Sequence, residues 1–178
     1  GSGGEVASRC SGAIESGESR PSVFAEALSA RWISNARYGG GQYGYGWFPL
    51  RAGLPPDVEA FQRAGDSLRE FVDRALGRYP IDPGRVVVAG FSQGGMMGYD
   101  LALRDPGRFA GLAALSSWFP PPLAELLPKQ PEHEGFPVLV VHGTRDDRIE
   151  VERARESREL LRPYGVAITY REFDMGHE

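Results

Sequence analysis

Residues 85–95 read Arg85-Val86-Val87-Val88-Ala89-Gly90-Phe91-Ser92-Gln93-Gly94-Gly95, and this stretch decides the fold. The β-branched run at 86–88 predicts a strand buried on both faces. Apolar residues among small ones at 93–103 predict a helix. A sharp strand-to-helix turn with a serine at its apex is the nucleophile elbow of serine hydrolases, which exposes the hydroxyl. We therefore predict that Ser92 is a nucleophile; an ordinary glycine-rich loop is the less favoured interpretation.

Composition limits the classes of protein to which the chain can belong. With 178 residues, 41% hydrophobic and 25% charged, it is typical of one soluble globular domain, which we place at 23–178 after a Gly/Ser-rich flexible tail at 1–22. A net charge of −4 without a Lys/Arg block argues against a nucleic-acid partner. No apolar run approaches the roughly 20 residues of a membrane span. The single cysteine, Cys10, cannot form an internal disulfide, which favours a cytoplasmic location.

Strand and helix patterns alternate along the rest of the chain. Asp57 is a suitable N-cap for a helix that ends near Pro80. The patterns also predict strands at 109–115, 137–141 and 166–173, helices at 22–35 and 151–161, and an aromatic-rich loop rather than a strand at 38–56. Strands that alternate with helices specify an α/β fold with a mainly parallel sheet flanked by helices. In such sheets ligands bind beyond the carboxyl ends of the strands.

A nucleophilic serine needs a base to accept its proton, and three histidines are available. His177 directly follows the last predicted strand, from which a loop can carry it to the elbow, so we predict that it is the base. His142 ends the strand at 137–141 and is predicted to be a structural hydrogen-bonding residue. His133 lies among charged residues and is predicted to be solvated.

The imidazole in turn needs a carboxylate that fixes its tautomer and stabilises its charged form. Asp146 and Asp147 both lie just past the strand at 137–141, and position alone does not choose between them. Asp174 is nearer to His177 in sequence, but residues so close on one loop usually point apart. The chain order serine, aspartate, histidine is the order of α/β-hydrolases.

Three motifs together resemble the phospholipase/carboxylesterase family, which includes acyl-protein thioesterases. They are the strings at 90–95, 142–146 and 176–178, and the similarity runs from about residue 46 to residue 178. The resemblance implies an α/β-hydrolase fold in which Ser92 is the nucleophile, Asp146 the acid and His177 the base. It implies small-molecule substrates, namely carboxylic esters, thioesters or lysophospholipids with apolar acyl groups, and an oxyanion donor at the backbone N–H of Gln93. Nothing in the sequence suggests a metal or organic cofactor.

The sequence departs from the family before residue 46. The family takes its second oxyanion donor from a His-Gly loop after an earlier strand, and no such motif precedes residue 46. We therefore expect a fold truncated at both ends, with an exposed sheet edge that invites homodimer formation. The alternative function is a non-catalytic α/β-hydrolase-like binding or assembly module. A third interpretation, a dienelactone-hydrolase-like enzyme, is disfavoured because those enzymes carry cysteine at the elbow.

Two aromatic pairs are candidates for the substrate pocket. Trp47 and Phe48 lie in the aromatic-rich loop, and Trp118 and Phe119 follow the strand at 109–115. Each pair has a structural interpretation of equal or greater weight, namely a cover for the core edge at 47–48 and a proline-stiffened lid at 118–123.

Overall fold

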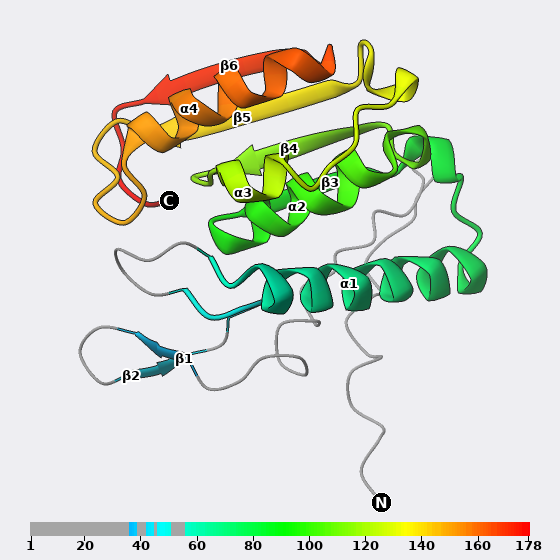
Figure 1. Ribbon diagram of the computed structural model, residues 1–178, viewed down its shortest axis with the longest axis horizontal. Helices are drawn as coiled ribbons and strands as arrows, with labels where there is room; N and C mark the ends of the chain where they lie inside the picture. The colour runs from blue at the N-terminus through cyan, green and yellow to red at the C-terminus, as the bar shows by residue number, and fades with distance from the viewer. Residues whose placement is uncertain (1–35, 39–41, 45, 51–55) are drawn as a thin grey trace, which may run out of the picture.

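The computed structural model describes residues 36–38, 42–44, 46–50 and 56–178 (Figure 1). Its main sheet has the strand order β3-β4-β5-β6, and every neighbouring pair is parallel. The strands are β3 (Val87–Phe91), β4 (Gly111–Leu115), β5 (Pro137–Gly143) and β6 (Ala167–Phe173). The predicted α/β class with a parallel sheet is confirmed. The predicted tail at 1–22 and helix at 22–35 lie outside the described residues.

Three of the described helices connect these strands and lie on one side of the sheet, whereas the longest helix precedes β3 and packs against the first of the three (Figure 1). In chain order the helices are α1 (Val58–Arg78), α2 (Gln93–Arg104), α3 (Pro121–Ala124) and α4 (Val151–Leu161). Asp57 is the N-cap of α1, as predicted, and accepts a hydrogen bond of 2.9 Å from the Ala60 N–H. Short 3-10 turns lie at Pro83–Arg85, Pro106–Arg108, Pro131–His133 and Arg162–Tyr164. In Figure 1, α4 lies along β5 and β6, while α2 lies along β3 and β4.

The two faces of the sheet differ in burial. Leu112, Val138 and other side chains that point toward the helices are buried in the core. On the opposite face Val87 is 61% exposed and Phe91 45% exposed. The prediction that the strand at 86–88 is covered on both faces is therefore wrong. The physical reason is that β3 is the first strand of the four-stranded sheet and the described helices cover one face only.

The predicted loop at 38–56 contains a strand. β1 (Ala36–Tyr38) pairs antiparallel with β2 (Gln42–Gly44), so the prediction of a loop is wrong at residue 38 and at 42–44. Three-residue strands are held by backbone pairing and lack the apolar alternation that identifies a longer strand in a sequence. In the described part of the chain, no helix combines the length and the apolar character that a bilayer crossing requires.

Candidate functional site

Ser92 lies at the sharp turn between β3 and α2. Its backbone has φ 54° and ψ −123°, a conformation that costs a non-glycine residue about 1–3 kcal/mol. Its N–H donates to the Leu115 carbonyl at 2.8 Å, and its carbonyl accepts from the Gly95 N–H at 3.0 Å. A side chain at Gly90 would overlap the main chain of Gly94, so strand and helix approach this closely only with glycine there. The predicted strand, turn and helix are present, and the serine stands at the carboxyl end of β3.

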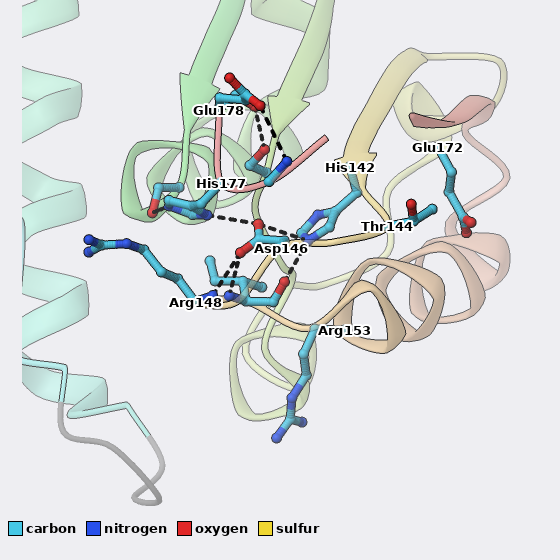
Figure 2. A network of polar contacts seen from close by, with 12 residues as sticks. His142, Thr144, Asp146, Arg148, Arg153, Glu172, His177 and Glu178 are labelled. Atoms are coloured by element: carbon cyan, nitrogen blue, oxygen red, sulfur yellow. Dashed lines mark hydrogen bonds and ion pairs between the residues drawn. The ribbon is translucent and has the colours of Figure 1, made fainter. Parts of the chain in front are cut away.

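His177 joins Ser92 to Asp146 in one chain of hydrogen bonds. Figure 2 shows the contact between His177 and Asp146. The imidazole Nε2 lies 2.9 Å from Ser92 Oγ, and Nδ1 lies 2.7 Å from Asp146 Oδ2. Because an ionised carboxylate only accepts hydrogen bonds, the proton sits on Nδ1 and the Nε2 lone pair faces the serine hydroxyl. The arrangement can accept a proton from Ser92 as the hydroxyl attacks.

Asp146 is held in place by the loop that follows β5. Its Oδ1 accepts from the backbone N–H groups of Arg148 and Ile149, both at 2.9 Å, and its side chain is fully buried. Burial raises the pKa of the Asp146 carboxyl, but these two hydrogen bonds and the one from His177 outweigh it, so the pKa lies below its usual value. The carboxylate is thus charged and can stabilise an imidazolium. Of the two neighbours that position alone left open, Asp146 contacts His177, whereas Asp147 is exposed.

The loop after β5 is joined to the segment that carries His177. The N–H groups of Thr144 and Arg145 donate to the carbonyls of Phe173 and Met175 at 2.8 and 3.0 Å. A side chain at Gly143 would overlap the carbonyls of Met175 and Gly176, so glycine is needed where the two segments cross. These contacts fix the distance between Asp146 and the His177 imidazole.

Asp174 contributes to the same connection without touching His177. Its Oδ1 lies 2.7 Å from Arg145 Nε, and its carbonyl accepts from Arg145 Nη2 at 2.9 Å. The expectation that Asp174 points away from His177 agrees with this geometry. Arg145 was not singled out in the sequence, although its place inside the His-Gly-Thr-Arg-Asp string is the signal that could have identified it.

Two further residues that the sequence did not indicate contact the end of the chain around His177. Ser116, fully buried and with φ 43°, donates from Oγ to the main-chain oxygen of Glu178 at 2.9 Å. The ring of Phe91 lies 4.9 Å from the His177 ring, at an interplanar angle of 51°. Ser116 directly follows β4, the strand beside the elbow, and that position is the only sequence signal for its role.

The other two histidines are both buried. His142 Nε2 lies 2.7 Å from the Ile149 carbonyl and 3.3 Å from Asp146 Oδ2, which agrees with the structural role predicted for it. Figure 2 shows Asp146 between this ring and His177. The prediction that His133 is solvated is wrong. Its Nδ1 accepts from the Gln130 N–H at 2.9 Å, and Nε2 lies 2.7 Å from the Leu103 carbonyl, because the ring caps the 3-10 turn at Pro131–His133.

The remaining candidates occupy different depths in the protein. Gln93 begins α2, and its side-chain amide bonds to the backbone of Trp47 and Phe48. Trp47 is half-buried, whereas Phe48 is in the core and packs edge-on against Phe61.

The second aromatic pair shows the same contrast. Trp118 is half-buried, with the Arg153 guanidinium 5.2 Å from its ring centre. Phe119 is in the core, 5.1 Å from the Tyr99 ring. Within the described ranges, no group of three or more His, Cys, Asp or Glu residues could hold a metal ion.

Comparisons with known proteins converge on one family. The model of the phospholipase/carboxylesterase family matches residues 31–178. Acyl-protein thioesterase 1 of Neurospora crassa is 32% identical over 143 residues, which cover 74% of this chain and 58% of that protein. A rice (Oryza sativa subsp. japonica) protein named as a probable inactive carboxylesterase is 30% identical over 139 residues, covering 74% of this chain and 56% of that protein. The chain thus spans somewhat more than half the length of these relatives.

A solved structure shows the same fold. The crystal structure of Arabidopsis thaliana SOBER1 superposes with a TM-score of 0.69 at 23% sequence identity, covering 82% of this chain and 72% of that one.

Proposed function

Because the chain belongs to the phospholipase/carboxylesterase family, we propose that it is a serine hydrolase that cleaves carboxylic esters or thioesters through an acyl-enzyme intermediate. In this proposal Ser92 is the nucleophile, His177 the general base and Asp146 the acid. The observation that carries it is the position of the His177 ring, whose two nitrogens lie 2.9 Å from Ser92 Oγ and 2.7 Å from Asp146 Oδ2.

The proposed reaction follows from these three contacts. Ser92 Oγ attacks the carbonyl carbon while its proton passes to His177 Nε2, and Asp146 stabilises the resulting imidazolium. The backbone N–H of Gln93 supports the oxyanion from the first turn of α2. The tetrahedral species collapses as the C–O or C–S bond breaks, and the imidazolium returns the proton to the leaving group. Water then attacks the acyl-enzyme with His177 again as the base, which releases the carboxylic acid.

A fluorophosphonate probe tests the nucleophile directly. We expect the probe to label the wild-type chain and a Ser67→Ala control, in which the serine lies on α1, but not Ser92→Ala. Equal labelling of Ser92→Ala and the control would contradict the assignment. Hydrolysis of p-nitrophenyl esters, followed by absorbance, should fail in Ser92→Ala as well.

The alternative, a non-catalytic binding or assembly module, is tested by the same measurements. A chain that is folded by circular dichroism but unlabelled, with no turnover of short or medium acyl esters, would favour it. A cytoplasmic location and a homodimer stay predictions from the sequence, and fractionation and sedimentation would test them. Both oxygen esters and thioesters belong in the first assay, because the proposed mechanism can break a C–O or a C–S bond.

A further inference from the structure

We propose that the side chain of Gln93 is a positioning residue for substrate selection, separate from the oxyanion role of its backbone N–H. It fixes residues 46–48 next to the nucleophile and so sets which acyl groups fit beside Ser92. This inference rests on the proposed function and adds a determinant of specificity to it.

The amide of Gln93 makes two hydrogen bonds of opposite sense with the same segment. The Trp47 N–H donates to Oε1 at 2.5 Å, and Nε2 donates to the Phe48 carbonyl at 2.6 Å. An amide side chain presents a donor and an acceptor side by side on one planar group, whereas a carboxylate only accepts and an ammonium only donates. The pair closes a sequence separation of 45 to 46 residues, so one side chain connects α2 to a distant part of the chain.

The two aromatic side chains of this segment are placed differently. Phe48 is 3% exposed, and its ring stands 5.1 Å from that of Phe61 on α1, which anchors the segment in the core. The half-buried Trp47 points elsewhere: its indole nitrogen is 3.8 Å from the place that a side chain at Gly94 would occupy. Gly94 is two residues past Ser92. The indole therefore stands beside the first turn of the nucleophile's helix, where any shift of the segment moves it relative to the reacting serine.

Loss of the amide would leave the Trp47 N–H and the Phe48 carbonyl without these partners. Residues 46–48 would then move until both groups found other hydrogen-bond partners. A misplacement of about 1 Å near a reacting centre can cost up to about 100-fold in rate. Because Trp47 is a large side chain beside the helix and not a donor to the reacting atoms, we expect its displacement to affect large acyl groups more than an acetyl group.

Three variants separate the side chain from the backbone of residue 93. Gln93→Met keeps the length and the backbone N–H but makes neither hydrogen bond. Gln93→Asn keeps an amide that is one methylene too short to span both partners. Gln62→Met makes the same change at an exposed glutamine of α1 and is the matched control.

The readout is the ratio of kcat/KM for p-nitrophenyl octanoate to that for p-nitrophenyl acetate. We expect both Gln93 variants to lower this ratio about tenfold, because KM rises more for octanoate than for acetate. Gln62→Met should leave the ratio unchanged. An unchanged ratio in Gln93→Met, or equal losses on both esters, would overturn the inference.

A double-mutant cycle with Trp47→Ala tests whether Gln93 acts through the indole. If it does, Gln93→Met should not change the ratio further in the Trp47→Ala background; additive effects would overturn the inference. Amide hydrogen exchange supplies a readout besides activity, since the Trp47 N–H should exchange faster in Gln93→Met than in Gln62→Met. A wild-type chain that hydrolyses neither ester contradicts the proposed function itself, whereas an active chain with the wild-type ratio in Gln93→Met contradicts this inference alone.

Discussion

Two buried carboxylates occupy opposite kinds of environment in this molecule. Asp100, on α2, lies between Arg69 of α1 and Arg104, whose nearest nitrogens are 2.7 and 2.5 Å from its oxygens. Asp146 lies between two imidazoles and also accepts two backbone N–H groups. Arginine is always charged, so Asp100 is held by permanent cations and joins two helices. Histidine exchanges protons near neutral pH, so Asp146 is paired with a group whose charge can change during a reaction.

Burial and function are separate properties of these two carboxylates. Both side chains are almost completely removed from solvent, so burial alone does not distinguish them. The partners distinguish them. Permanent cations make Asp100 a cross-link between two helices, whereas Asp146 contacts an imidazole that also faces a serine hydroxyl. Substitution at each aspartate should therefore change a different measured quantity.

The largest effect is expected for Asp146→Asn. The amide keeps the shape of the side chain but no longer stabilises an imidazolium, and it can orient His177 as the wrong tautomer. Loss of this function costs on the order of 1,000- to 10,000-fold in turnover. The measurement is kcat on p-nitrophenyl acetate. Asp147→Asn, at the exposed neighbouring position, should stay within twofold of wild type. Similar losses in both variants would show that the loop, and not the Asp146 charge, is responsible.

Asp100→Asn should produce the reverse pattern. It removes the charge that Arg69 and Arg104 contact, and hydrogen bonds to charged groups contribute about 1.5–3 kcal/mol each. Because both arginines can reach solvent, we expect a loss of about 2 kcal/mol in the free energy of unfolding, measured by urea denaturation. Turnover of the folded fraction should not change. Asp66→Asn, which touches Arg69 from an exposed position, is the control and should cost at most about 0.5 kcal/mol.

His142 allows a finer test of the Asp146 environment. Its Nε2–H points at the Ile149 carbonyl and at Asp146 Oδ2, so it restrains the loop that presents the acid. His142→Leu should lower kcat about tenfold with little change in KM, because it disturbs the orientation of the acid and not substrate contacts. His142→Gln retains a donor and should recover part of the loss. Equal activity in the two variants would show that the ring acts by packing alone.

The sequence predicts those features of the fold and the candidate site that depend on local chemistry, but not those that depend on tertiary packing. The elbow at Ser92 and the helix capped by Asp57 are predictable because each depends on local chemistry: a strand, a turn and a cap. The exposure of one face of β3 is not predictable in this way, because burial of Val87 depends on which elements pack on each side of the sheet. His133 shows the same limit, since its surroundings in the sequence are charged while its ring is buried against the Leu103 carbonyl.

Within the site, chain order predicts the chemical types and resemblance chooses Asp146 over Asp147. The supporting contacts of Ser116 and Arg145 cannot be predicted in this way. They join residues that are 62 and 29 positions apart in the sequence, and no periodic pattern in the sequence indicates that these residues lie close together in the fold. The amide of Gln93 is a similar case: its position after Ser92 indicates the backbone role, but the partners of its side chain are 45 and 46 residues away.

The smallest effect concerns a third carboxylate, Glu172 of β6, which pairs with a permanent cation at the surface. Arg155 of α4 donates to both of its oxygens at 2.8 Å, and the Tyr170 hydroxyl donates to one of them. The Arg155 hydrogen bonds, reinforced by that hydroxyl, lower the pKa of Glu172 from 4.5 to about 2. A carboxylate whose pKa is lower in the folded state stabilises the fold above its unfolded pKa and loses that contribution as the pH falls toward the folded value.

Wild type should therefore lose stability relative to Glu172→Gln as the pH falls from about 4.5 toward about 2. The pair is solvent-exposed on the Arg155 side, so the difference should not exceed about 1 kcal/mol. Urea denaturation at pH 6 and pH 3.5 measures it, with Glu159→Gln, an exposed glutamate of α4, as the control. Turnover at pH 7 should be unaffected. A pH-dependent loss of stability as large as that expected for Asp100→Asn would mean that the arginine partner, and not burial, sets the strength of an ion pair. A small loss would mean that an ion pair with arginine contributes strongly only when the carboxylate is buried.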